Sequence, residues 1–405
     1  MSPRLQQIVT NIGAVGIIVG AFLVLTHPQW VGFEQPAPTS PNSAESPNSS
    51  QSAATSPAVS SSTKSSKPKP APPSRQEIAS SSPISIPLKT SQPASTVIAE
   101  ISTTTDSFLV ARIPDPYPFS PQSFTTINEW ARVALVNILC GPRNGTFKPI
   151  SASGVIIDPR GIILTNAHAA QYLLLSSDPT VDLSCVIRTG SPAYPTWNAE
   201  ILYVPPSWVK EHAKDINEAH PLGTGEHDYA LLRVTSTING QPLSALPFVQ
   251  IDTREGIAFT DDQILAASYP AEFAGGIVTQ LNLYPSSSVT SIKKMMTLSG
   301  NTIDVVSLGG IIGAQSGSSG GAVVNAWGRL VGIISTTSEG TTTADRDLHA
   351  ITLSYIDRDI ASESGLNLSD ILNSDIAGRA YLFNATIAPS LRQLIIDQIE
   401  GTASR

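Results

Sequence analysis

A serine stands between glycines in the run Gly317-Ser318-Ser319-Gly320-Gly321, directly before the apolar residues 322–324. Glycines on both sides allow the backbone to take positive φ and to approach a ligand closely. They also leave backbone N–H groups unobstructed, as a site that stabilises an oxyanion requires. A serine hydroxyl is a poor nucleophile near neutral pH and needs a neighbouring base. Ser319 is therefore a candidate nucleophile, provided that a histidine and a carboxylate occur in suitable contexts elsewhere.

Among the six histidines, His168 has the context that a general base needs. It follows an apolar run, 162–164, that ends in Thr165-Asn166-Ala167, which places the imidazole at the edge of a rigid sheet. The alternative is a histidine that only serves the structure. The remaining five lie at a membrane boundary, in a polar insertion, before an aspartate or in a late strand: His27, His212, His220, His227 and His349.

The carboxylate candidate is Asp228, immediately before the apolar run 229–232. An acid in that position is partly buried, where it can orient an imidazole and stabilise its protonated form. The alternative is an aspartate that only caps a strand, and Glu226 is a second choice further from the buried run.

The candidates His168, Asp228 and Ser319 lie among many short apolar runs that are separated by Gly, Pro and Asn turns. Such a pattern predicts an all-β sandwich or barrel. Residues 153–158 and 161–166, joined by Pro159-Arg160-Gly161, have the pattern of a hairpin. The other predicted strands lie at 133–140, 183–190, 199–204, 229–234, 246–251, 263–270, 281–292, 303–310, 321–326, 329–335 and 349–356. Helices are expected at 123–131, 207–219, 354–362 and 389–401.

Three motifs occur in the order TNAHAA, HDYALL and GSSGGAVV, with His168, Asp228 and Ser319 inside them. In this order and context they resemble the trypsin-like (chymotrypsin-fold) serine endopeptidases. The segments SGVIIDPRGIILTNAH and SGSSGGAVVNAWGRLVGI are similar in particular to the bacterial HtrA/Deg branch. The resemblance covers about residues 130–357.

The resemblance implies two antiparallel six-stranded β-barrels with the active site between them. His168 would be the general base, Asp228 the acid that orients it, and Ser319 the nucleophile. The N–H groups of Gly317 and Ser319 would form the oxyanion hole. Gly313 would lie at the base of the specificity pocket, with Ser335, Thr336 and Thr337 along a wall. No acid is placed there to attract Lys or Arg, so small or medium uncharged side chains are expected in the substrate.

Two positions depart from the family's pattern, and one module is expected to be missing. Ser318 replaces the aspartate that pairs with a freed N-terminal ammonium in enzymes activated by cleavage, so no activation of that kind is expected. Ala322 replaces the usual proline after Gly320-Gly321. We expect no PDZ domain after the protease domain, which we place at 123–405.

The first quarter of the chain differs in composition from the rest. Residues 8–26 are uncharged and about as long as a helix that spans a bilayer. Arg4 precedes this run and no other Lys or Arg follows it before Lys64, which puts residues 1–7 in the cytoplasm and the protease domain outside. An uncleaved signal anchor is favoured over a cleaved signal peptide. Residues 27–105 are rich in Pro and Ser and are expected to be a disordered tether, followed by an extended lead-in at 106–122.

Charge and cysteine content argue against two classes of partner, nucleic acids and metal ions. With 24 Lys+Arg against 32 Asp+Glu and no basic run, the chain has no pattern of nucleic-acid binding. Cys140 and Cys185 fit no zinc pattern, and neither a metal nor another cofactor is expected. In the first barrel that the resemblance implies, both cysteines would lie on strands outside the cytoplasm, where they form a disulfide or stay as two buried thiols.

Taken together, the sequence predicts a membrane-anchored endopeptidase that cleaves proteins or peptides through an acyl-enzyme. One alternative is a protease fold without catalysis that serves as a binding or scaffold protein. Another is an HtrA-like quality-control protease that also holds unfolded chains. HtrA-like enzymes are often trimers, so a homo-oligomer is one of the alternatives for the assembly of this chain.

Overall fold

The computed structural model describes residues 110–142, 149–217, 224–271, 279, 281–298, 300–311, 313–337, 342 and 344–403. Residues 1–7, the predicted anchor at 8–26, the predicted tether at 27–105 and the start of the lead-in lie outside these ranges. No helix within the described ranges is long and apolar enough to cross a membrane.

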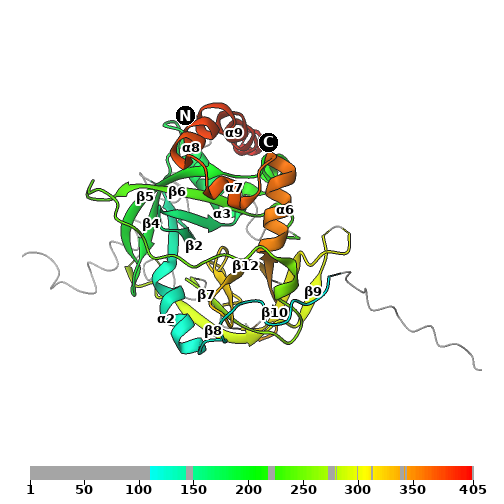
Figure 1. Cartoon of the computed structure of the whole chain (residues 1–405). Coiled ribbons are helices and arrows are strands. Elements are labelled where there is room, and N and C mark those ends of the chain that lie inside the picture. Colours follow the sequence, from blue (N-terminus) through cyan, green and yellow to red (C-terminus); the bar gives the residue numbers. More distant parts are fainter. Residues whose placement is uncertain are drawn as a thin grey trace, which may run out of the picture. The chain divides into compact units, whose positions relative to one another are not determined.

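Six antiparallel strands close into a barrel in the first half of the described structure, in the order β1-β2-β3-β6-β5-β4. The first predicted six-stranded barrel is therefore confirmed, and Figure 1 shows it in teal to green, with β2, β4, β5 and β6 labelled. Its strands are β1 (Leu135–Gly141), β2 (Ile150–Asp158), β3 (Ile162–Thr165), β4 (Ser184–Thr189), β5 (Tyr194–Tyr203) and β6 (Ala230–Thr237).

The second half forms a seven-stranded sheet in the order β8-β7-β11-β12-β13-β10-β9. Its strands are β7 (Gln263–Ser268), β8 (Ser286–Ser291), β9 (Lys294–Met296), β10 (Val305–Gly309), β11 (Ala322–Asn325), β12 (Leu330–Thr337) and β13 (Leu348–Thr352). The predicted strand at 246–251 is wrong, because only an isolated bridge between Ile251 and Leu330 forms there.

The second sheet differs from the predicted six-stranded barrel by one strand, and the reason is a break between β8 and β9. These two strands stand at opposite ends of the sheet order, yet only Ile292 and Lys293 separate them in the chain. The N–H of Ile292 donates to the carbonyl of Asp262 at 3.0 Å, and the N–H of Lys293 donates to Ser307 at 2.7 Å. One bent strand thus bonds to β7 with its first half and to β10 with its second, which makes the sheet barrel-like.

Helices cover both sheets and the junction between them. Helix α2 (Phe124–Ala134) begins at Ser123, whose hydroxyl accepts the N–H of Thr126, and buries Ile127, Ala131 and Ala134 on one face. The other helices are α3 (Ala167–Ser176), α4 (Pro206–His212), α6 (Leu353–Ser364), α7 (Leu368–Leu372), α8 (Ile376–Thr386) and α9 (Ala388–Ala403), with 3₁₀ turns at Ala213–Asn217 and Glu255–Ile257.

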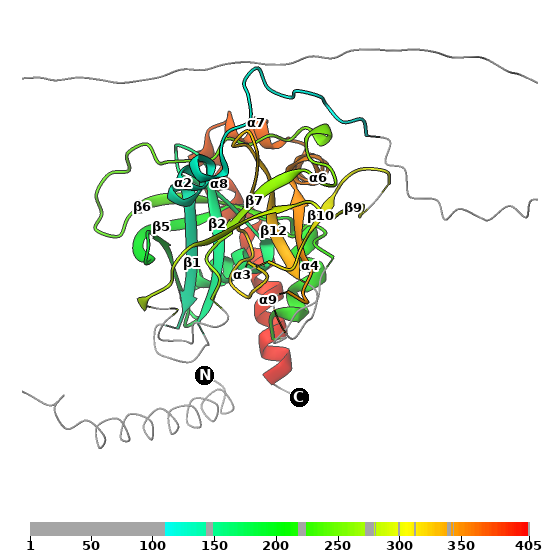
Figure 2. The ribbon, with the colours of Figure 1, turned by 90° about the horizontal axis from the view of Figure 1, so that it is seen from below.

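The C-terminal helices pack on the first barrel and on the helices beside it. Helix α8 contacts β5, and α9 contacts α3, α4 and the 3₁₀ turn after α4. The red helices lie over the first barrel in Figure 1, and Figure 2 shows α9 beside α3 and α4. Helices α7 and α8 were not predicted from the sequence, although Asn367 and Asp370 form a capping box at the start of α7.

Strand register brings the chemically important segments together. Thr165 at the end of β3 pairs with Ala230 at the start of β6, so the residues just after β3 and just before β6 meet at one edge. In the second sheet, Ala322 pairs with Ala267 of β7 and with Ile333 of β12. The 317–321 turn therefore lies beside the ends of both neighbours.

One covalent bond follows from the register of the first barrel. Cys140 of β1 stands directly opposite Cys185 of β4. Their sulfur atoms are bonded, with an S–S distance of 1.98 Å. The disulfide alternative, and not the pair of free thiols, is the one present in the structure.

Candidate active site

His168 and Asp228 meet at the edge where β3 ends and β6 begins. The Nδ1 atom of His168 lies 2.9 Å from Oδ2 and 3.1 Å from Oδ1 of Asp228. The backbone N–H of His168 also donates to Oδ1, at 3.0 Å. Because Nδ1 donates its proton to the carboxylate, Nε2 carries the free lone pair of the neutral ring. The pair thus presents a base on the side of the ring away from Asp228.

The helix that carries His168 contributes to this arrangement. Asn166 is the N-cap of α3 but makes no side-chain capping bond; its Nδ2 donates instead to the carbonyl oxygen of Asp228 at 2.8 Å. The carboxylate of Asp228 takes the free N–H of the first turn in its place. A helix N-terminus favours an anion, so α3 helps to keep Asp228 charged.

Charge and burial shift the pKa values of this pair in opposite directions. Burial alone would lower the pKa of His168, but the charge of Asp228 and its hydrogen bond outweigh burial and raise that pKa above 6.5. Burial alone would raise the pKa of Asp228, but His168 and Ser335 hold it below 3.8. Asp228 therefore stays ionised across the neutral range, and the ring gains basicity from it.

Ser335 of β12 links the acid to the serine turn. Its hydroxyl is buried and donates to Oδ2 of Asp228 at 2.8 Å. Its carbonyl oxygen accepts the hydroxyl of Ser319 at 3.3 Å. The structure thus joins Ser319 and Asp228 through one residue, whereas no hydrogen bond between Ser319 and His168 occurs among the described residues.

The backbone of the serine turn leaves two N–H groups without an acceptor. The N–H groups of Ser318, Gly320 and Gly321 donate to the carbonyls of Gln315, Ile334 and Ser318. The N–H groups of Gly317 and Ser319 donate to no acceptor within the described part of the chain. They are the two N–H groups predicted to form the oxyanion hole, and both are available for a ligand.

Two glycines are required for this turn to pack. Gly317 has φ of +92°, and a Cβ there would lie 2.8 Å from the Cβ of Ala271. Gly320 has φ of +83°, and a Cβ there would lie 2.1 Å from the carbonyl oxygen of Ser153. Any other residue at either position would strain the backbone and displace a neighbour.

The predicted specificity pocket is described only in part. Gly313 is buried, and a Cβ there would meet Ile311, Leu348 and Ser268 at ordinary contact distances. Ser335 directs its hydroxyl to Asp228, a role that the sequence analysis did not assign to it. The side chains of Thr336 and Thr337 lie outside the described residues, so the pocket assignment stays a prediction.

Three residues have positioning roles that were not predicted from the sequence. Asn166 and Ser335 hold Asp228, as described above, and Ser153 of β2 bonds to the serine turn. The motif around His168 contains Asn166, but the bond of its side chain to a carbonyl 62 positions away depends on the β3–β6 pairing. Ser153 and Ser335 are ordinary serines of strands and carry no local signal.

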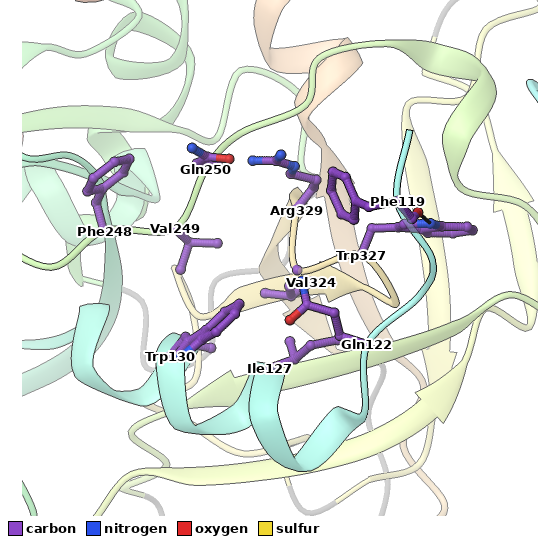
Figure 3. A pocket seen from close by; sticks show the side chains of 12 residues that line it. Phe119, Gln122, Ile127, Trp130, Phe248, Val249, Gln250, Val324, Trp327 and Arg329 are labelled. Carbon is purple, nitrogen blue, oxygen red and sulfur yellow. Dashed lines mark hydrogen bonds between the residues drawn. The ribbon is translucent and has the colours of Figure 1, made fainter. Parts of the chain in front are cut away.

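A cavity of about 320 Å³ lies away from these residues, between α2 and the turn that joins β11 to β12. Trp130 and Phe248 lie on one side of it and Phe119 and Trp327 on the other (Figure 3). None of His168, Asp228 and Ser319 lines it. Within the described ranges, no three His, Cys, Asp or Glu side chains are placed to hold a metal ion.

Comparison with known proteins shows what this region is similar to. Comparison with the curated proteins gives no match. A crystal structure of the serine endoprotease from Yersinia pestis aligns with 61% of this chain and 70% of its own, at 20% sequence identity and a TM-score of 0.38. Residues 152–333 match the family profile of the trypsin-like peptidase domain. These residues include His168, Asp228 and Ser319, and they are similar to the trypsin-like peptidase domain over somewhat less than half of the chain.

Proposed function

We propose that the chain is a serine endopeptidase that hydrolyses peptide bonds through an acyl-enzyme, with Ser319 as nucleophile, His168 as general base and Asp228 as the acid that orients it. The observation that carries the proposal is the pairing of a basic imidazole with a buried carboxylate beside a serine turn with two free N–H groups. The match of residues 152–333 to the trypsin-like peptidase domain supports it.

The reaction begins when the Ser319 hydroxyl attacks the carbonyl carbon of the scissile bond. Its proton moves to Nε2 of His168, and the carbonyl oxygen becomes an oxyanion that accepts the N–H groups of Gly317 and Ser319. The imidazolium is stabilised by Asp228 and then gives its proton to the leaving amine as the C–N bond breaks. A water molecule cleaves the resulting ester by the same steps, and Ser319 regains its proton.

The serine hydroxyl must turn before it can attack. In the structure it donates to the carbonyl of Ser335 at 3.3 Å, which is a long and weak hydrogen bond. Rotation about the Cα–Cβ bond releases it, and catalytic hydrogen bonds are often incomplete before substrate binds. The same bond is the observation that favours the rival function, a protease fold that binds proteins without cleaving them.

Covalent labelling separates these two functions. We expect a fluorophosphonate probe to label the full-length chain at Ser319, and Ser319→Ala to abolish the label. His168→Ala should slow labelling roughly 10⁴-fold, as loss of a triad side chain does elsewhere. His212→Ala is the matched control, because His212 also pairs with an aspartate, Asp215 at 2.9 Å, but at the partly exposed end of α4. Binding of unfolded protein without any Ser319-dependent label would establish the scaffold function instead.

We also propose that the protease domain lies outside the cytoplasm. The uncharged run at 8–26 supports a single signal anchor with the protease domain outside the cytoplasm. The Cys140–Cys185 disulfide supports it as well, since disulfides persist in oxidising compartments. Protease treatment of intact cells should digest the domain and leave the N-terminus protected; a domain protected until lysis would contradict this topology.

The substrates are proposed to be proteins or peptides with small or medium uncharged residues before the cleaved bond. This rests on Gly313 at the predicted pocket base and on the lack of an acid there. Cleavage of a peptide library followed by mass spectrometry tests it, and a preference for Lys or Arg would contradict it. The same assay on folded and unfolded proteins tests for a quality-control role.

A further inference from the structure

Ser153 of the first barrel lies under the serine turn of the second sheet and is fully buried, with 0% of its surface exposed. Its backbone N–H donates to the carbonyl of Ser319 at 2.8 Å. Its hydroxyl donates to the carbonyl of Gly317 at 2.7 Å and accepts the N–H of Tyr269 at 2.8 Å. One residue of β2 therefore bonds to three residues of the other sheet.

The two carbonyls that Ser153 holds belong to the residues whose N–H groups are free. Gly317 and Ser319 each have their carbonyl bonded to Ser153 and their N–H without an acceptor among the described residues. The Gly317 N–H belongs to the preceding peptide unit, whose carbonyl, that of Ser316, accepts the N–H of Ala271 at 2.8 Å. Ser153 and Ala271 thus hold the two peptide units on either side of the Gly317 Cα. The two N–H groups are thus oriented from both sides: the carbonyls of their own peptide units bond to Ala271 and Gly321, and the carbonyls of the next units bond to Ser153.

The hydroxyl of Ser153 is the only side-chain group in this set of bonds. Without it the N–H of Tyr269 and the carbonyl of Gly317 would be buried and unpaired, which is costly enough for the turn to shift toward another partner. The backbone bond to Ser319 would remain, so the effect would fall on the Gly317 side. Ser153 is itself held in place, since Thr165 donates its hydroxyl to the Ser153 carbonyl at 2.7 Å.

We propose that Ser153 is a positioning residue for the oxyanion hole, whose hydroxyl orients the Gly317 side of the serine turn from across the two sheets. The proposal rests on the proposed endopeptidase function for its effect on rate. Ser153 would then hold this turn together with Ser268, whose hydroxyl donates to the hydroxyl of Ser318, the residue that stands in place of an aspartate, at 3.1 Å.

The test compares Ser153→Ala and Ser153→Cys with Ser151→Ala in the full-length chain. Cysteine keeps the volume but is a weak hydrogen-bonding group, so it separates bonding from packing if the alanine variant folds poorly. Ser151 lies two residues earlier on β2, and its hydroxyl accepts the side chain of Asn137 at 2.8 Å, away from the turn. Fluorophosphonate labelling, peptide hydrolysis and amide hydrogen exchange are measured on folded protein.

We expect both Ser153 variants to label Ser319 roughly 10- to 100-fold more slowly, because a misplaced donor loses much of its effect on the transition state. The value of kcat should fall while KM and the pH midpoint of the rate stay unchanged, since Ser153 has no bond to His168 or Asp228. Amide exchange should quicken in residues 265–271 and 314–321, and Ser151→Ala should change neither rate nor exchange.

A Ser153→Cys protein that labels and exchanges like the unsubstituted chain would overturn the proposal. Amide exchange also keeps the two proposals separate. If the unsubstituted chain shows no Ser319-dependent labelling, the endopeptidase function fails, and faster exchange in the serine turn of the Ser153 variants would still support the positioning role.

Discussion

At the scale of single residues, the imidazole of His168 is controlled by one carboxylate. Asp228 accepts both the Nδ1 proton and the backbone N–H of His168, so it fixes where the ring lies and which nitrogen is free. The same contact raises the pKa of His168 above 6.5, against the effect of burial. In the proposed reaction only the neutral ring can take a proton from Ser319, so this pKa would set the acid limit of the rate.

We therefore expect the rate of Ser319 acylation to rise with pH through a midpoint above 6.5. Below the midpoint His168 is protonated and cannot act as a base; above it the ring is neutral, while Asp228 is charged throughout because its pKa is lowered. Labelling rates measured from about pH 5 to about pH 9 check this. A midpoint at or below 6.5 would show that Asp228 does not stabilise the protonated ring.

At the scale of elements, helix α6 holds the segment that presents Asp228. His227 has φ of 55°, and its backbone N–H donates to the hydroxyl of Tyr355 at 2.9 Å. Its Nδ1 lies 2.8 Å from Oδ2 of Asp359, which also accepts the hydroxyl of Tyr229 at 2.8 Å. The residues on both sides of Asp228 are thus fixed to one helix, which stands beside the second sheet in Figure 1.

The hydrogen bond to Asp359 raises the pKa of His227, more than burial lowers it. A raised pKa in the folded state adds stability that is complete below the unfolded value of 6.5 and is lost as pH rises through the folded pKa. We expect Asp359→Asn to lower the melting temperature more at about pH 6 than at about pH 9. Asp357→Asn on the same helix is the control, because its carboxylate accepts the N–H of Leu368 and its effect should not depend on pH in this way. An equal loss at both pH values for Asp359→Asn would contradict the pairing.

Helix α9 supports the helix that carries His168. It packs against α3 and α4, and its Ile395 is fully buried whereas the adjacent Leu394 is 39% exposed. We expect Ile395→Ala to lower the free energy of unfolding by about 2–5 kcal/mol through lost burial and a cavity. Leu394→Ala should change it by no more than about 0.5 kcal/mol. Urea unfolding measures both, and similar values for the two variants would show that α9 does not pack as described.

At the scale of the whole domain, the site exists only where the two sheets meet. His168 and Asp228 come from the first barrel, and the serine turn comes from the second sheet. Ser335 and Ser153 cross the junction in opposite directions, the first from the second sheet to Asp228 and the second from the first barrel to Gly317. Stability of each half therefore bears on the geometry of the other.

The Cys140–Cys185 bond stabilises the first of these halves. It closes a loop with a sequence separation of 45, and in the chain-entropy account such a loop contributes about 3–4 kcal/mol. We expect replacement of both cysteines by alanine to lower the free energy of unfolding by about that amount, and reductant to have the same effect on the unsubstituted chain. Mass spectrometry with and without reductant shows whether the bond is present; two free thiols in the isolated protein would refute it.

From the sequence alone the strand pattern indicated an all-β sandwich or barrel, and the family resemblance indicated two barrels and the candidate residues. The short apolar runs separated by turns led to most of the strands, and the contexts of His168, Asp228 and Ser319 marked them as one set, because base, acid and nucleophile each need a strand end or a glycine turn. The sequence did not reveal the 246–251 segment as a loop, the break between β8 and β9 or helices α7 and α8. An apolar run such as 246–251 becomes a strand only where a partner strand pairs with it, and here only Ile251 bridges to Leu330.

Only the tertiary structure decided what each of these residues touches. The pairing of Thr165 with Ala230 brings His168 to Asp228 across 60 positions, and no local pattern contains that register. The same holds for Ser153, Ser335 and Asn166, whose hydrogen bonds span 164, 107 and 62 positions. A serine in a strand has no role that can be recognised from the sequence. Its role depends on the carbonyl or carboxylate that the fold places next to its hydroxyl, and here that placement depends on the packing of two sheets.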